Sequence, residues 1–389
     1  MKTAIKGIIV TAAFIGPGTV TTASVVGAEL GYQIVWALVF SIFATCILQL
    51  MAHRLGAYGK IGLSEATLLL ITNKPAKFLV SFLIICAIGI GNAAYEGGNI
   101  TGAALGIQST FGGSLSLWSI LIGSIAAILL ISGKYQILEK VLVLLVAGMS
   151  FMFISLMFVI GINWSSLAFG LIPRFQDVTL LSLVLALIGT TIVPYNLFLH
   201  SGMTAADKSS EQDKEWPLFL SLGLGGLVTL AIISSAATAF FAQGIMLDKQ
   251  NLAQQLEPVL GERASIFFAL GLFSAGITSA ITAPLAASYA ISGLFGWTQS
   301  LKHKGFMSVA LLIVIFGTLV SSLGFKPFSV ILLAQTTNAI LLPISAILLL
   351  IACNSTKIMK SKTNSRGVNL AAISVILVVF LLSLMKLIG

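Results

Sequence analysis

The sequence predicts an all-α polytopic membrane protein, and three observations carry this prediction. Of the 389 residues, 58% are hydrophobic and only 8% are charged, whereas an average soluble domain is about 25% charged. The mean hydropathy is +1.07. Apolar runs of the length that crosses a bilayer as a helix recur along the whole chain. This composition excludes a soluble enzyme, a nucleic-acid-binding domain and a disordered protein.

Eleven apolar runs are candidate transmembrane helices, separated by loops too short to hold a soluble domain. We also expect a short surface helix over residues 248–263. The candidate spans are residues 8–29, 33–55, 79–108, 116–133, 138–161, 180–202, 217–243, 264–296, 305–323, 327–352 and 368–388.

The distribution of Lys and Arg predicts the orientation of these spans. With the N-terminus inside, sixteen Lys and Arg residues fall in cytoplasmic segments and five in outer segments, as the positive-inside rule requires. The net charge of +9 follows from this bias and does not indicate a nucleic-acid partner. We expect a bacterial inner-membrane protein with a cytoplasmic N-terminus and an extracytoplasmic C-terminus.

Two spans carry helix breakers at their centres. Residues 16–19 of the first span read Gly-Pro-Gly-Thr, and residues 193–196 of the sixth read Val-Pro-Tyr-Asn. Proline lacks the amide donor, and glycine lowers the cost of leaving helical geometry. Each break begins a set of five spans, and because five is odd the second set is inverted. This pattern is typical of secondary transporters with a midplane site.

The inverted sets divide the chain into three units. Residues 1–161 form the first five-helix repeat and residues 162–352 the second. Residues 353–389 form a cytoplasmic linker and the eleventh helix.

Residues 193–201 carry a resemblance to a known family. They read Val-Pro-Tyr-Asn-Leu-Phe-Leu-His-Ser and are similar to the Met-Pro-His-Asn-Leu-Tyr-Leu-His-Ser of the natural-resistance-associated macrophage protein (Nramp) family. Residues 16–19 fall where the family has Asp-Pro-Gly-Asn, and Gln335 falls where it has a glutamine close to the metal. The resemblance implies a leucine-transporter-type fold of five plus five inverted helices and proton-coupled transport of divalent metals.

The departures from the family fall on its metal ligands. Gly16, Thr19 and Val193 occupy the positions of the metal-binding Asp, Asn and Met. A divalent cation in a low-dielectric site needs charge compensation, and the thioether helps to select manganese or iron over calcium and magnesium. We therefore expect the fold of the family without its metal.

The acidic and histidine residues of the family's proton route are also partly replaced. Glu96 and Asn99 stand at the two acidic positions of the third span. Tyr195 replaces the first histidine of the sixth span, whereas His200 is retained. The candidate coupling or proton-pathway residues are Glu96, His200 and Asn99, and the coupling ion is sodium or a proton.

Without the aspartate, the helix N-termini at the two breaks should carry an unmasked positive potential. The resulting hypothesis is a transporter of a small inorganic ion by alternating access, with a small anion such as bicarbonate at the unwound centres. The candidate substrate-binding residues are Gly16, Gly18, Thr19, Val20, Thr22, Val193, Tyr195, Asn196 and Gln335.

Several alternatives stay open. The first is a proton-coupled transporter of manganese, iron or magnesium, the second a transporter of an amino acid or small solute, and the third a non-transporting relic of the fold. The sequence shows neither the continuous polar pore of a channel nor the paired nucleophile and base of an enzyme. We expect no enzymatic activity and no bound cofactor, metal or nucleic acid.

Overall fold

The structure is a computed structural model that describes residues 15–133, 136–173, 178–206, 215–248 and 251–388. Every regular element within these residues is a helix. The longer helices are α2 (Pro17–Leu30), α3 (Val35–Gly59), α4 (Leu63–Leu70), α5 (Lys74–Ile84), α6 (Gly91–Phe111), α7 (Leu115–Ser132), α8 (Gln136–Ile160), α10 (Val178–Thr191), α11 (Pro194–Ala206), α12 (Trp216–Ala239), α14 (Ala264–Phe295), α15 (Lys304–Ser322), α16 (Pro327–Asn354) and α18 (Arg366–Ile388).

The shorter elements join these helices. Where a surface helix was predicted over residues 248–263, the described residues 252–263 form three short helical turns rather than one helix. The short elements are η1 (Ile85–Ile90), α9 (Trp164–Phe169), η2 (Phe241–Gln243), η3 (Leu252–Leu256), α13 (Glu257–Leu260), η4 (Gly261–Arg263) and α17 (Thr356–Met359).

Ten segments of the described chain are long and apolar enough to cross a membrane. The second half of the first predicted span is α2, and residues 8–14, its first half, lie outside the described residues. The predicted third span is longer than expected, because α5, a π-helical turn and α6 form one run over residues 74–111. A multi-pass membrane protein is thus confirmed, whereas the count of eleven spans stays a prediction.

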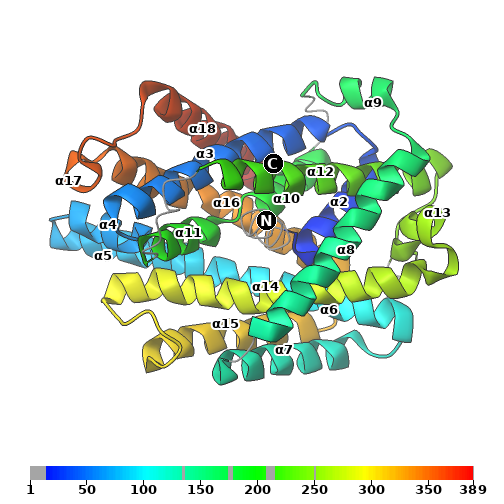
Figure 1. Ribbon diagram of the computed structural model, residues 1–389, viewed down its shortest axis with the longest axis horizontal. Helices are drawn as coiled ribbons and strands as arrows, with labels where there is room; N and C mark the ends of the chain where they lie inside the picture. Colours follow the sequence, from blue (N-terminus) through cyan, green and yellow to red (C-terminus); the bar gives the residue numbers. More distant parts are fainter. Residues whose placement is uncertain (1–14, 134–135, 174–177, 207–214, 249–250, 389) are drawn as a thin grey trace.

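The helix packing has the symmetry expected of two inverted halves. The first span packs on the seventh (α2 on α12), and the sixth packs on the second (α11 on α3). The third packs on the ninth (α6 on α15), and the eighth on the fourth (α14 on α7). Figure 1 shows α14 running along the molecule, α15 and α7 beside it, and α8 crossing obliquely. The boundaries predicted for the three units stay a prediction.

The predicted break of the sixth span is present, and in the first span a helix begins where the break was predicted. Helix α2 begins at Pro17 after an extended Gly16 (φ −89°, ψ 173°). In the sixth span α10 ends at Thr191 and α11 begins at Pro194. Proline is tolerated at the first turn of a helix, where its missing N–H would have had no intrahelical partner. Pro284, by contrast, lies inside the uninterrupted α14.

Candidate functional site

The N-terminus of α2 satisfies most of its own amide groups. The carbonyl of Gly16 accepts hydrogen bonds from the amides of Thr19 (3.1 Å) and Val20 (3.2 Å). Pro17 has no amide hydrogen. Of the amides of Gly18, Thr19 and Val20 in this first turn, those of Thr19 and Val20 are therefore already engaged in hydrogen bonds. The break in the sixth span behaves in the same way, since the amide of Asn196 donates to the carbonyl of Val193 (3.1 Å).

Gln335 of α16 lies between the two breaks. Its side chain is fully buried, and both Oε1 and Nε2 lack a hydrogen-bond partner among the described residues. A Cβ atom on Gly18 would collide with its carboxamide, and one on Gly189 of α10 would collide with its backbone carbonyl. The two glycines therefore allow α16 to approach both broken spans closely.

Two threonine hydroxyls join the broken spans directly. The Oγ1 atoms of Thr19 and Thr190 are 3.1 Å apart, and both side chains are buried. They border a cavity of about 20 Å³, enough for one water molecule. The hydroxyl of Thr22, one turn further along α2, is buried without a hydrogen-bond partner in the described part of the chain.

Two tyrosines, Tyr95 of α6 and Tyr195 of α11, pack beside the breaks. The rings of Tyr95 and Tyr195 meet edge to face, with centroids 5.4 Å apart. A Cβ atom on Gly16 would lie 3.0 Å from the Ser279 hydroxyl and 3.5 Å from that of Tyr95. Sequence reasoning missed Tyr95, Ser279 and Thr190, because nothing in their local patterns marks them as neighbours of Gly16 or Thr19.

Glu96 lies in a helix interface. It is fully buried, and its Oε2 accepts a hydrogen bond from Asn99 Nδ2 at 3.2 Å. It packs against Gly317 of α15, where a Cβ atom would collide with its side chain. Glu96 Oε1 and Asn99 Oδ1 have no hydrogen-bond partner within the described ranges. The structure thus brings the two coupling candidates of α6 together.

His200 is separate from that pair. Its Nδ1 lies 2.7 Å from Oε1 of Gln49, and its ring faces that of His53, with centroids 5.4 Å apart. Gln49 and His53 are both on α3, about 150 residues earlier in the chain, so no sequence spacing links them to His200. Among the described residues, no three His, Cys, Asp or Glu side chains form a group that could hold a metal.

Comparison with known proteins places the chain in a family. A profile described as natural resistance-associated macrophage protein-like matches residues 7–389. The chain belongs to the Nramp family. This result confirms the resemblance noted at the two breaks and makes the protein a membrane transporter by family.

Curated relatives of this Nramp chain carry a functional name. A protein of Acidiphilium cryptum is 25% identical over 88% of this chain and 80% of its own length. One of Mycobacterium tuberculosis is 24% identical over 96% of this chain and 88% of its own length. Both are named divalent metal cation transporter MntH.

Solved structures confirm the fold. The Eremococcus coleocola manganese transporter matches with a TM-score of 0.73 and 22% identity, over 97% of this chain and 84% of the other. Mhp1, a nucleobase-cation-symport-1 family transporter, matches with a TM-score of 0.55 and 13% identity, over 98% of this chain and 91% of the other. The leucine-transporter-type fold is therefore confirmed.

The prediction of a small anion such as bicarbonate is wrong. It is overturned by the family match and by relatives named as divalent metal cation transporters. The structure supplies the physical reason: the carbonyl of Gly16 occupies the amides of Thr19 and Val20. That helix N-terminus therefore lacks the array of free donors on which the anion hypothesis depended.

Proposed function

We propose that this Nramp protein carries a divalent metal cation across a bacterial inner membrane by alternating access. The relatives that share most of its length are named for this activity. In this proposal the ion passes the unwound centres of the first and sixth spans, and the N-terminus of the chain is cytoplasmic. The small inorganic ion expected from the sequence is then a metal cation.

The observation that carries the proposal is the unpartnered carboxamide of Gln335. A buried polar group without a hydrogen bond costs about 1–3 kcal/mol, and native proteins rarely keep one without a reason. Gln335 Oε1 is a neutral oxygen donor between the two breaks. A cation that it coordinates on passage would offset that cost.

The end of α10 adds a second favourable contribution. A helix C-terminus carries about half a negative charge. Helix α10 ends at Thr191, directly after Thr190 and two residues after Gly189, which packs against the backbone of Gln335. The hydroxyls of Thr19 and Thr190 supply further oxygen donors. Carbonyl, carboxamide and water oxygens suit manganese and magnesium. Without a carboxylate, this centre would hold its ion weakly and release it readily.

Coupling to a proton or to sodium is part of the same proposal. The buried Glu96 and its partner Asn99 are the candidates on the α6 side, and His200 is the candidate on the inner side. Absence of enzymatic activity and of a resident cofactor stays a prediction.

Uptake into proteoliposomes tests the proposal. Vesicles containing the full chain and a metal-sensitive dye should accumulate Mn²⁺ when it is added outside, whereas empty vesicles should not. Gln335→Leu should slow uptake at least about 10-fold. Because this amide has no hydrogen-bond partner among the described residues, an apolar residue of similar size should leave the protein folded.

Thr337→Ala is the matched control. Thr337 lies two residues further on α16, and its hydroxyl donates a hydrogen bond to the carbonyl of Leu333 in its own helix. This variant should transport like the wild type. No Mn²⁺ and no Mg²⁺ uptake by correctly folded wild-type protein would contradict the proposed function.

A further inference from the structure

Two of the three histidines of the chain meet between α3 and α11. The rings of His53 and His200 have centroids 5.4 Å apart and planes inclined by 46°. His200 is six residues beyond the start of α11 at Pro194, or about 9 Å along the helix axis. Under the predicted orientation, the pair lies on the cytoplasmic side of the break.

The hydrogen bond to Gln49 fixes the proton on the His200 ring. Gln49 is buried, and its Oε1 lies 2.7 Å from His200 Nδ1. A carboxamide oxygen can only accept, so Nδ1 donates and the neutral ring keeps a lone pair on Nε2. Metal-binding histidines are oriented in this way by a second acceptor on the ring nitrogen that does not bind the metal.

The second ring also has a nitrogen with no protein partner. Nε2 of His53 is buried and forms no hydrogen bond to any described residue. An unsatisfied imidazole nitrogen at depth needs a water, a proton or a metal ion to complete it. The neutral His200 ring keeps its lone pair on Nε2, and its centroid lies 5.4 Å from that of the His53 ring.

The separation of the rings fits one shared ion. Imidazole nitrogens bind first-row metals at about 2.0–2.1 Å, which puts each ring centroid about 3.2 Å from the metal. At a tetrahedral angle the two centroids would be about 5.2 Å apart. The observed separation is 5.4 Å.

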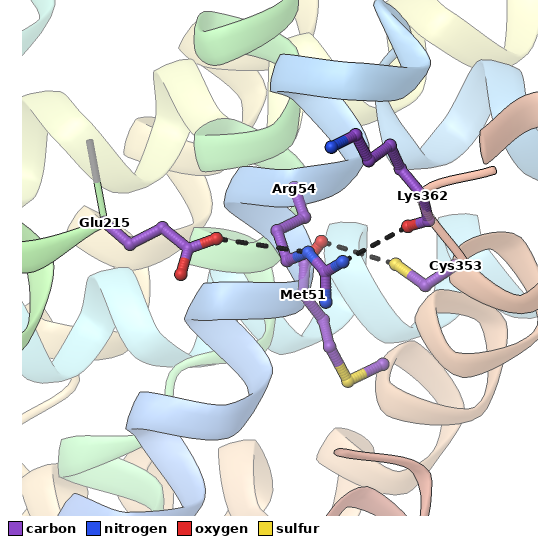
Figure 2. A network of polar contacts seen from close by, with 5 residues as sticks. All are labelled: Met51, Arg54, Glu215, Cys353 and Lys362. Carbon is purple, nitrogen blue, oxygen red and sulfur yellow. Dashed lines mark hydrogen bonds and ion pairs between the residues drawn. The ribbon is translucent and has the colours of Figure 1, made fainter. Parts of the chain in front are cut away.

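The cation nearest in sequence has its own partners. Figure 2 shows the Arg54 side chain between Glu215 and the backbone of Lys362. Its Nε lies 4.0 Å from a Glu215 carboxylate oxygen, and its NH2 group donates to the Lys362 carbonyl at 3.3 Å. The carboxylate offsets the charge of Arg54, which reduces its repulsion of a metal ion at the adjacent His53.

We propose that His53 and His200, with Gln49 orienting His200, form a binding site for a divalent transition-metal ion on the inner side of the transport path. This inference rests on the proposed function only for the route by which the ion arrives. Two neutral imidazoles without a carboxylate bind weakly, as a site that passes its ion onward requires. Imidazole suits iron, copper and zinc, whereas magnesium keeps oxygen and water ligands, so the pair distinguishes these ions.

Calorimetric titration of the purified full chain with Zn²⁺, and with Mg²⁺ in parallel, tests this site. The wild type should bind Zn²⁺, and Mg²⁺ should give no signal from this pair. His53→Gln and His200→Gln should each weaken Zn²⁺ binding at least about 10-fold. Gln49→Leu should weaken it about 10-fold, the usual effect of losing a group that orients a ligand.

The third histidine provides the matched control. His303 Nδ1 caps the N-terminus of α15 through the amide of Phe306. Asparagine can cap in its place, so His303→Asn should bind Zn²⁺ like the wild type. With Cu²⁺ as a second probe, electron paramagnetic resonance should show two coupled nitrogens in the wild type and one in each of the other two histidine variants.

The outcomes separate this site from the central one. Unchanged Zn²⁺ affinity in His53→Gln and His200→Gln would overturn the histidine site, even if Mn²⁺ uptake were intact. Loss of uptake in Gln335→Leu with unchanged Zn²⁺ binding would support two distinct sites. Zn²⁺ binding that depends on both histidines would uphold the site even if wild-type vesicles took up no metal.

Discussion

The centre of the broken spans and the contact between α3 and α11 differ in their polar side chains. The centre has threonine hydroxyls and the carboxamide of Gln335, but glycine and valine where the family has its aspartate and methionine. The α3–α11 contact pairs two imidazoles, one of them hydrogen-bonded to Gln49. The imidazole nitrogens therefore lie apart from the hydroxyl and carboxamide groups of the centre.

The backbones of neighbouring helices approach closely in both regions. At the centre, α16 approaches α2 and α10 so closely that Gly18 and Gly189 have no space for a Cβ atom. At the α3–α11 contact, a Cβ atom on Gly56 would collide with the backbone carbonyl of Ser201. The two regions therefore differ in their side-chain chemistry, and both should be sensitive to added volume at these glycines.

The largest effect is expected from Gly189→Val. Its Cβ would collide with the backbone carbonyl of Gln335, which cannot move away as a side chain can. We expect a loss of stability of about 2–3 kcal/mol and complete loss of uptake. Thermal unfolding and size-exclusion elution measure the first, and the dye assay measures the second.

Gly223→Ala is the control for that experiment. It lies on α12, and nothing lies within 4 Å of the place where its Cβ would be. This substitution should preserve both stability and uptake. If Gly189→Val behaved in the same way, the close approach of α16 to α10 would be wrong.

A second prediction restores the family's ligands at the centre. Gly16→Asp with Val193→Met should raise the affinity for Mn²⁺ at least about 10-fold, because a carboxylate compensates the ion's charge. The new Cβ at position 16 meets the Ser279 hydroxyl at 3.0 Å, so a small side-chain adjustment suffices. Calorimetry with Mn²⁺ measures the gain.

Ser279→Ala provides room for the same change and serves as its control. Combined with the two restoring substitutions, it should retain the higher affinity. Affinity equal to that of the wild type in both variants would mean that the centre is not where the ion binds.

A third prediction separates binding from coupling. Glu96→Gln keeps a hydrogen-bonding group of the same shape beside Asn99 but cannot ionise. Mn²⁺ affinity should stay within about twofold of the wild type, since Glu96 lies at the α6–α15 interface. The acceleration of uptake by an inward proton gradient should disappear. A gradient response identical to that of the wild type would exclude Glu96 as the coupling group.

The smallest effect concerns Glu65 on α4, outside the spanning segments. The start of α4 is tied to α11, since the amide of Leu63 donates to Ser201 Oγ at 3.1 Å, next to His200. Burial raises the pKa of Glu65 above its usual 4.5, although the side chain of Gln299 donates to it at 2.7 Å. A raised pKa in the folded state means that this carboxyl favours folding below pH 4.5, and that the contribution is lost as the pH rises through the folded-state pKa.

Glu65→Gln should remove this pH dependence. The difference in melting temperature between pH 4 and pH 8 should be smaller in the variant than in the wild type. Glu257→Gln, at an exposed carboxylate on α13, should leave the difference unchanged. A larger pH dependence in Glu65→Gln would reverse the assigned sign.

Sequence periodicity predicted the spans well, because a bilayer imposes length and hydrophobicity on each helix independently of its neighbours. The break of the sixth span and the start of a helix at Pro17 were predicted for an equally local reason, the chemistry of proline and glycine. The extent of the third span was underestimated, since α5 begins at Lys74, within a more polar stretch. The prediction of a small anion was wrong because it treated the N-terminal amides of α2 as free, whereas those of Thr19 and Val20 donate to the carbonyl of Gly16.

The sequence by itself determined that this chain is a helical membrane protein with helix breakers in its first and sixth spans, and which family ligands it lacks. Only the tertiary structure decided what surrounds the breaks: Gln335 against Gly18 and Gly189, Thr19 against Thr190, and His53 against His200. The physical reason is the distance along the sequence over which each of these effects acts. Hydropathy and backbone chemistry act within a few residues, whereas these contacts join residues 146 to 317 positions apart, and the packing of the folded helices alone brings them together.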